Sequence, residues 1–150
     1  MANRPQIWLF PLLLLALLAS LLSACSSSQD SKSEHSFLMA SMQDMPAEVK
    51  QAPVSVQQSY QFAVANPDVL EQIPCYCGCG AMGHTSNFDC YVSAQNSDGS
   101  PVYDSHALGC SICVDITLDT MRLLDQGKSV EEIKAFVDQT YSQYGPSNIP

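Results

Sequence analysis

Cysteine and histidine side chains are concentrated in the middle of this 150-residue chain. Six thiols and two imidazoles fall within the 39 residues from 75 to 113. They are Cys75, Cys77, Cys79, His84, Cys90, His106, Cys110 and Cys113. Thiolates and imidazoles are the preferred ligands of soft or borderline ions such as Cu(I) and Zn(II). The density of these side chains predicts a site for copper or zinc, with all eight side chains as candidate ligands.

The spacing of the cysteines gives a physical reason for such a site. In an extended segment Cys75, Cys77 and Cys79 point to the same side, and the neighbouring glycines allow the backbone to curl. At a helix start, Cys110 and Cys113 lie one turn apart on one face, where the helix dipole favours their thiolate forms. Eight candidates exceed the needs of one tetrahedral site, so two metal ions, or one ion with a disulfide, would use the set.

Two other kinds of chemistry use the same cysteines. Cys110 and Cys113 form a C-x-x-C pair, which is typical of thiol–disulfide oxidoreductases, with His106 nearby as a base. Alternatively, the six cysteines form three structural disulfides, although a bridge between residues two apart is strained and the histidines would then have no role. An enzyme is expected only under the redox alternative, because the acidic residues show no paired arrangement for acid–base catalysis.

The N-terminus predicts export and lipid attachment. Arg4 precedes the nearly apolar stretch of 16 residues from Ile7 to Leu22, which is shorter than the roughly 20 residues that a membrane span needs. Small residues then lead to Cys25, a pattern typical of the bacterial lipobox, in which cleavage leaves a diacylated cysteine at the new N-terminus. We expect Cys25 to anchor the protein to the cell membrane on its extracytoplasmic face.

These features divide the chain into three parts. Residues 1–24 form the predicted signal peptide, 25–45 the lipidated N-terminus and a flexible polar tether, and 46–150 a Cys-rich helical domain. The net charge of −9 excludes a nucleic-acid partner, because too few basic side chains are present to neutralise phosphates. Besides the membrane, an apo-metalloprotein or a thiol protein is the expected partner.

Helical segments must position the cluster. Apolar spacing and end signals predict helices between Pro53 and Asn66, from Pro67 to about Ile73, from Cys110 to Gln126, and from Val130 to Tyr144. Ser129 and Glu132 fit a capping box, and Gly127 a helix stop, so the last two helices should form an antiparallel hairpin. The predicted fold is mostly all-α, with a long irregular Cys/His-rich loop over residues 74–109.

The segment Pro74-Cys75-Tyr76-Cys77-Gly78-Cys79 resembles a family of bacterial lipoproteins named for the PCYCGC motif. The resemblance runs from about Met45 to Pro150. It includes Ala63–Pro67, Gly83-His84, Asp89–Tyr91, Ser105–Cys110 and Ile112–Asp115. It implies a lipid-anchored, cysteine-rich domain and no particular substrate.

A second resemblance covers only Leu124 to Gly145, which is similar to the helical hairpin of the thiol-reductase subunit of cytochrome c maturation. That likeness implies an all-α fold and thiol redox chemistry. The C-x-C-x-C segment in front of the hairpin departs from the reductase pattern.

Overall fold

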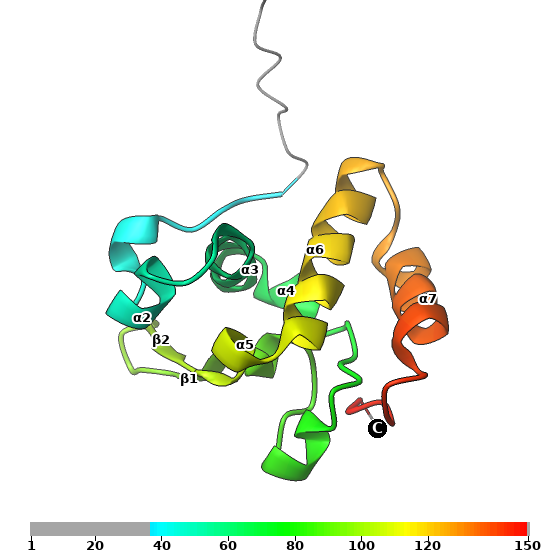
Figure 1. Ribbon diagram of the computed structural model, residues 1–150. Helices are drawn as coiled ribbons and strands as arrows, with labels where there is room; N and C mark the ends of the chain where they lie inside the picture. The colour runs from blue at the N-terminus through cyan, green and yellow to red at the C-terminus, as the bar shows by residue number, and fades with distance from the viewer. Residues whose placement is uncertain (1–36, 150) are drawn as a thin grey trace, which may run out of the picture. The chain divides into compact units, whose positions relative to one another are not determined.

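The computed structural model describes residues 37–149, so the predicted signal peptide, Cys25 and the first part of the tether lie outside the described residues. The described range forms a small helical domain with six α-helices, one two-stranded sheet and three 3₁₀ helices (Figure 1). The α-helices are α2 (Ala47–Lys50), α3 (Val54–Ala65), α4 (Pro67–Leu70), α5 (His106–Gly109), α6 (Ser111–Asp125) and α7 (Val130–Tyr141). The strands are β1 (Val92–Gln95) and β2 (Pro101–Tyr103), and the 3₁₀ helices are η2 (Met42–Asp44), η3 (Cys79–Met82) and η4 (Phe88–Cys90).

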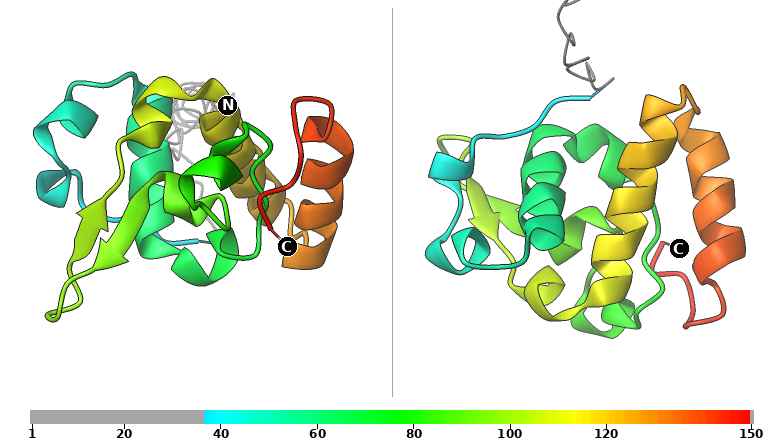
Figure 2. Two further views of the ribbon diagram at one scale, coloured as in Figure 1. Left: turned by 90° about the horizontal axis from the view of Figure 1, so that it is seen from below. Right: turned by 45° about the horizontal axis from the view of Figure 1, so that its top comes forward.

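Helix α6 is the centre of the fold. It lies between α3 and α7 and packs against both, as Figure 1 and the right panel of Figure 2 show. Its apolar side chains Ile116 and Leu123 are buried, as the predicted stripe requires. Thr117 and Thr120 are also fully buried, and each hydroxyl donates a hydrogen bond to the carbonyl four residues earlier. The core therefore accepts polar side chains where their donors find partners within the helix.

The connection between α6 and α7 has the predicted end signals. Gly127 adopts a φ of 76°, and its N–H bonds to the carbonyl of Leu124 while the N–H of Lys128 bonds to that of Leu123. This is a Schellman ending, which satisfies the last carbonyls of α6. Ser129 and Glu132 form the predicted capping box at the start of α7. The two helices pack side by side, which confirms the predicted hairpin.

The first described residues are attached to α3. The ring of Phe37 meets that of Phe62 edge-on, at a centroid distance of 5.0 Å. Asn66 occupies the predicted N-cap position of α4, but its side chain makes no capping bond. Its amide donates instead to the carbonyls of Leu38 and Phe62, at 2.8 Å each. Residues 37–45, which the sequence assigned to the tether, thus contact the core.

The predicted irregular loop contains more regular structure than we expected. The left panel of Figure 2 shows the hairpin of β1 and β2 projecting from the helices, and Gly99 forms its turn with a φ of 82°. Helix α5 then occupies residues that the sequence left irregular. The strands have only four and three residues and are mostly exposed, and such short segments give too weak an alternation signal to predict a strand. Among the described residues, no helix is long and apolar enough to cross a membrane.

Candidate metal centre

The thiols and one imidazole of the predicted site converge into two groups. Within each group, the potential ligand atoms all lie within 4.8 Å of one another. The group that we name the outer group is Cys77, His106, Cys110 and Cys113, and the inner group is Cys75, Cys79 and Cys90. All six cysteines of the described residues are unbridged thiols. Seven of the eight predicted ligands are therefore brought together, and His84 is the one left outside both groups.

The motif segment divides its own cysteines between the two groups. Cys75 and Cys79 belong to the inner group, and Cys77 belongs to the outer group. The three sulfurs nevertheless meet in one cluster, because that of Cys77 lies 3.4 Å from that of Cys75, and those of Cys75 and Cys79 lie within 4.8 Å of each other. Gly78 adopts a φ of 84°, which reverses the chain direction before η3, so the strict alternation of an extended strand does not apply. This turn curls the backbone around the sulfurs.

The two groups touch through Cys113. Its sulfur lies 3.3 Å from that of Cys75, 3.3 Å from that of Cys90 and 3.6 Å from that of Cys77. The sulfur of Cys75 also lies 3.4 Å from that of Cys77. With Zn–S bonds of ~2.3 Å, the sulfurs around a tetrahedral ion would be ~3.8 Å apart. The observed spacings lie close to that edge length, so a modest expansion would admit an ion.

Helix α5 presents His106 to the cluster. The ring atom Nε2 lies 3.3 Å from the sulfur of Cys77. The backbone N–H of His106 donates to a carboxylate oxygen of Asp104 at 2.7 Å, which fixes the start of the helix. The imidazole is therefore held at the cluster by its helix, with Nε2 as the nitrogen available to a metal.

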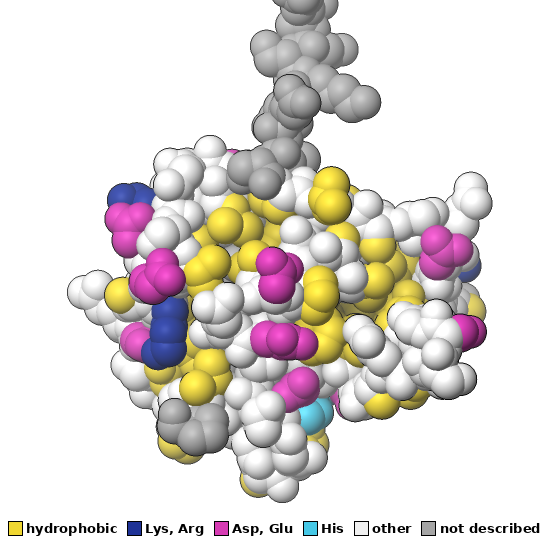
Figure 3. Space-filling view, turned by 180° about the vertical axis from the view of Figure 1, so that it is seen from behind, with side chains coloured by type: hydrophobic (Ala, Val, Ile, Leu, Met, Phe, Trp, Pro, Cys, Tyr) yellow, Lys and Arg dark blue, Asp and Glu magenta, His cyan; other side chains and the backbone are white. Residues whose placement is uncertain are grey.

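His84 lies beside the cluster without joining it. Its ring meets that of His106 edge-on, at a centroid distance of 5.3 Å, and its Nε2 is 3.7 Å from a carboxylate oxygen of Asp104. Its Nδ1 atom is buried and has no hydrogen-bond partner. This imidazole adjoins one ligand and is not itself part of either group. On the face shown in Figure 3, histidine atoms emerge beside an acidic side chain.

Hydrogen bonds among the thiols shift their pKa values in opposite directions. The pKa of Cys75 is lowered far below its usual range because the thiols of Cys113 and Cys90 donate to its sulfur. The pKa of Cys113 is raised because its proton is held by Cys75 and by Cys90, and because the side chain is buried. Burial raises the pKa of Cys77 and of Cys79 as well. The pKa of each thiol in the cluster thus depends on its neighbours.

A buried polar network supports the backbone at Cys113. Its carbonyl accepts hydrogen bonds from the Tyr91 hydroxyl at 2.9 Å, from the Thr117 hydroxyl at 3.1 Å and from the Asn87 amide at 3.3 Å. Tyr91 and Thr117 are joined at 2.7 Å, and the side chains of Tyr91, Thr117 and Asn87 are fully buried. Such outer partners fix the orientation of ligands in metal sites. These side chains support the ligand groups without belonging to either of them.

The end of the described chain returns to the motif. The N–H of Cys75 donates to Oδ1 of Asn148 at 2.6 Å, and Nδ2 of Asn148 lies 3.6 Å from the sulfur of Cys79. The same amide group donates to the carbonyl of Ser86 at 3.0 Å. Gly145 passes so close to the motif that an added Cβ would meet the carbonyl oxygen of Tyr76 at 2.8 Å. Sequence reasoning missed Asn148, because no local pattern links it to the cysteines.

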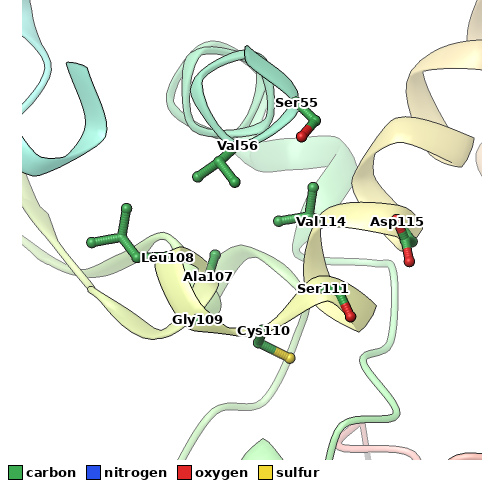
Figure 4. Close-up of a pocket in the computed structure, with 9 residues that line it drawn as sticks. All are labelled: Ser55, Val56, Ala107, Leu108, Gly109, Cys110, Ser111, Val114 and Asp115. Carbon is green, nitrogen blue, oxygen red and sulfur yellow. The ribbon is translucent and has the colours of Figure 1, made fainter. Parts of the chain in front are cut away.

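Cys110 is the ligand nearest to an opening of the surface. It is half-buried and borders a shallow cavity of about 270 Å³ between α3 and the start of α6. Val56, Leu108 and Val114 line that cavity, and the sulfur of Cys110 points away from α3 (Figure 4). The outer group therefore has a ligand at the rim of the molecule. By contrast, the inner group is fully buried.

Acidic side chains outnumber basic ones in this protein. Acidic side chains are spread over the face in Figure 3, whereas basic ones lie toward its edges. The whole chain carries 15 acidic and 6 basic residues. Such an excess of acidic side chains attracts cations and repels polyanions.

Comparisons with known proteins give one match. No curated protein and no solved structure matches the chain significantly, so the expected similarity to the thiol-reductase subunit of cytochrome c maturation has no support. The model of a protein family, described as a protein of unknown function with PCYCGC motif, matches residues 14–150. That range contains the motif and every residue of both ligand groups. The chain belongs to this PCYCGC-motif family.

Proposed function

We propose that this protein binds a soft or borderline metal ion, copper or zinc, and holds it in reserve or delivers it to another protein. The observation that carries the proposal is the convergence of seven Cys and His ligand atoms into two groups that touch through Cys113. Six of the seven ligands are sulfur. A donor set so rich in thiolate favours Cu(I) and Zn(II) over harder ions such as Mg²⁺ or Ca²⁺.

Delivery is favoured over a purely structural role by the position of the outer group. His106, Cys77 and Cys110 are half-buried, and Cys110 borders an open cavity. A thiol of a partner protein could approach the ion from this side and replace one ligand at a time.

The proposed location is the extracytoplasmic face of the cell membrane. The apolar N-terminal stretch and the lipobox-like residues before Cys25 support a diacyl anchor on that cysteine. The expected partners are an apo-metalloprotein or a thiol protein in the same compartment. Replacing Cys25 by alanine should abolish incorporation of labelled fatty acid, and equal labelling of both proteins would overturn the anchor.

The metal proposal is tested by elemental analysis of the full chain, exported in a bacterial host and purified anaerobically without chelators. We expect near-stoichiometric copper or zinc, and thiols that react with a thiol reagent only after a chelator is added. The histidines supply matched variants: His106→Gln should lower metal content or affinity, whereas His84→Gln should leave the stoichiometry unchanged. Absence of metal and of free thiols, before and after the chelator, would replace the proposal with structural disulfides.

The competing function is thiol–disulfide exchange by Cys110 and Cys113. Cys110 is accessible enough to attack a partner, but Cys113 is fully buried and contacts three other thiols. Its raised pKa also disfavours the thiolate that exchange requires. A mixed disulfide with a partner, trapped on Cys110 in a Cys113→Ser variant of a metal-free protein, would favour the redox function instead.

A further inference from the structure

We infer that the cluster is a binuclear centre, in which the sulfur of Cys113 bridges an inner and an outer metal ion. This inference rests on the proposed function, because it assigns the number and arrangement of the ions at the same site. The outer ion would be held by the four residues of the outer group, and the inner ion by the inner group together with Cys113.

The number of ligands requires one shared sulfur. Two tetrahedral ions need about eight metal–ligand bonds, and the two groups supply seven residues. The outer group is complete with four ligands, whereas the inner group has three and lacks one. The shared ligand must therefore belong to the outer group and also reach the inner one.

Cys113 meets this requirement with the shortest approaches to the inner group. It belongs to the outer group, and its sulfur is 3.3 Å from the sulfurs of two inner-group residues, Cys75 and Cys90. The other close approach between the groups joins Cys75 to Cys77 at 3.4 Å. Sharing Cys75 would leave the inner ion with three ligands and give the outer ion five. Sharing Cys77 would also give each ion four, but Cys113 approaches two inner sulfurs at 3.3 Å, whereas the approach of Cys77 to Cys75 is longer, at 3.4 Å. Sharing Cys113 gives each ion four.

The position of Cys113 suits a bridging thiolate. A thiolate sulfur has lone pairs for two ions, and burial removes water that would compete for them. Cys113 is fully buried, and its backbone is held by Tyr91, Asn87 and Thr117. Binding of each ion releases the protons of its thiol ligands to solvent, and the oxidation state of the metal does not change.

The two ions would differ in how readily they exchange. The inner-group residues are buried, with exposed fractions of 0% for Cys75, 2% for Cys79 and 0% for Cys90. The outer ion has three half-buried ligands, one of them at the edge of a cavity. Since access of solvent and competing ligands controls exchange, we expect a chelator to remove the outer ion on the order of tenfold faster or more.

The test is anaerobic titration of the metal-free full chain with Zn(II), followed by elemental analysis after gel filtration. Two ions per chain are expected in the unaltered protein. Cys110→Ser should lose the outer ion and Cys79→Ser the inner ion, so each should retain one. Cys113→Ser should retain fewer ions per chain than Cys110→Ser or Cys79→Ser, because it removes a ligand from both ions.

A second measurement does not depend on the folding of variants. In the unaltered protein loaded with Co(II), a bridging thiolate couples the two ions magnetically. The electron paramagnetic resonance signal per cobalt should therefore become weaker as the second equivalent of Co(II) is added. Two ions without coupling would overturn the bridge, and a limit of one ion per chain would overturn the binuclear centre while leaving the proposed function intact. No bound ion would overturn both.

Discussion

Cys75 and Asn148, 73 residues apart in the chain, are joined by two hydrogen bonds. The N–H of Cys75 donates to Oδ1 of Asn148 at 2.6 Å, and the N–H of Asn148 donates to the carbonyl of Cys75 at 3.2 Å. One residue of the C-terminal segment thus satisfies both backbone polar groups of a cluster cysteine. The segment after α7 is therefore part of the frame of the metal centre.

Replacing Asn148 by alanine should destabilise the metal-free protein. Cys75 is fully buried, and an unsatisfied buried N–H costs about 1–3 kcal/mol. Denaturant unfolding measures the change. Asn96→Ala supplies the control, because the amide of Asn96 donates to the hydroxyl of Ser100 within the exposed hairpin turn. Equal free energies of unfolding for the two variants would contradict the role of Asn148.

Gly145→Ala should separate the C-terminal segment from the motif. The added methyl group would lie 2.8 Å from the carbonyl oxygen of Tyr76, so the backbone must move away. Such crowding costs about 1–3 kcal/mol, and we expect faster removal of metal by a chelator as well. Gly109→Ala is the matched control, because its Cβ would meet nothing within 4 Å. The prediction fails if the two variants release metal at the same rate and unfold alike.

Metal affinity should rise with pH. The pKa values of Cys77, Cys79 and Cys113 are raised, so these thiols hold protons at neutral pH and must lose them to bind metal. Lowering the pH therefore favours the metal-free protein. Competition for the metal against a chelator whose own pH dependence is known, from pH 6 to about 8, measures how the affinity changes with pH. A pH-indicator dye counts the protons released on binding. Affinity independent of pH would show that the thiols are not the ligands.

The capping box at α7 should affect stability without affecting the metal centre. Ser129→Ala removes the hydroxyl that accepts from the N–H of Glu132, at a cost of about 1 kcal/mol. Thermal unfolding of the metal-free protein measures this loss, with Ser97→Ala in the exposed hairpin turn as control. The stoichiometry of bound metal should be the same in all three proteins. A loss of metal in Ser129→Ala would mean that occupancy reports only overall stability.

Helices α3, α6 and α7 could be predicted from the sequence because their signals are local, whereas the four-residue helices α2 and α5 were missed. The proline before α3, the capping box of Ser129 and Glu132, and the stop at Gly127 all act within one turn of a helix end. The set of candidate ligands was also predictable, since cysteine and histidine are rare and were concentrated in one stretch. Seven of the eight candidates meet in the two groups.

The arrangement of the ligands could not be predicted in the same way. The position of Cys79 relative to Cys75 and Cys77 depends on how the motif curls at Gly78, and glycine permits several such turns. The separation of His84 from the cluster depends on how η3 and α5 are placed by the rest of the fold. The bonds of Asn148 depend on the packing of α7, so they leave no trace in local spacing.

The long span between Cys75 and Asn148 also sets an order of events during synthesis. When the ribosome has made the last cluster cysteine, Cys113, the sulfurs are all present, but α7 and the segment that bonds to Cys75 do not yet exist. A nascent chain at that stage can expose its thiols to any ion or oxidant it meets. The hydrogen bonds between Cys75 and Asn148 can form only after residue 148 has been synthesised. We therefore expect correct binding of metal after that point and not in the shorter nascent chain.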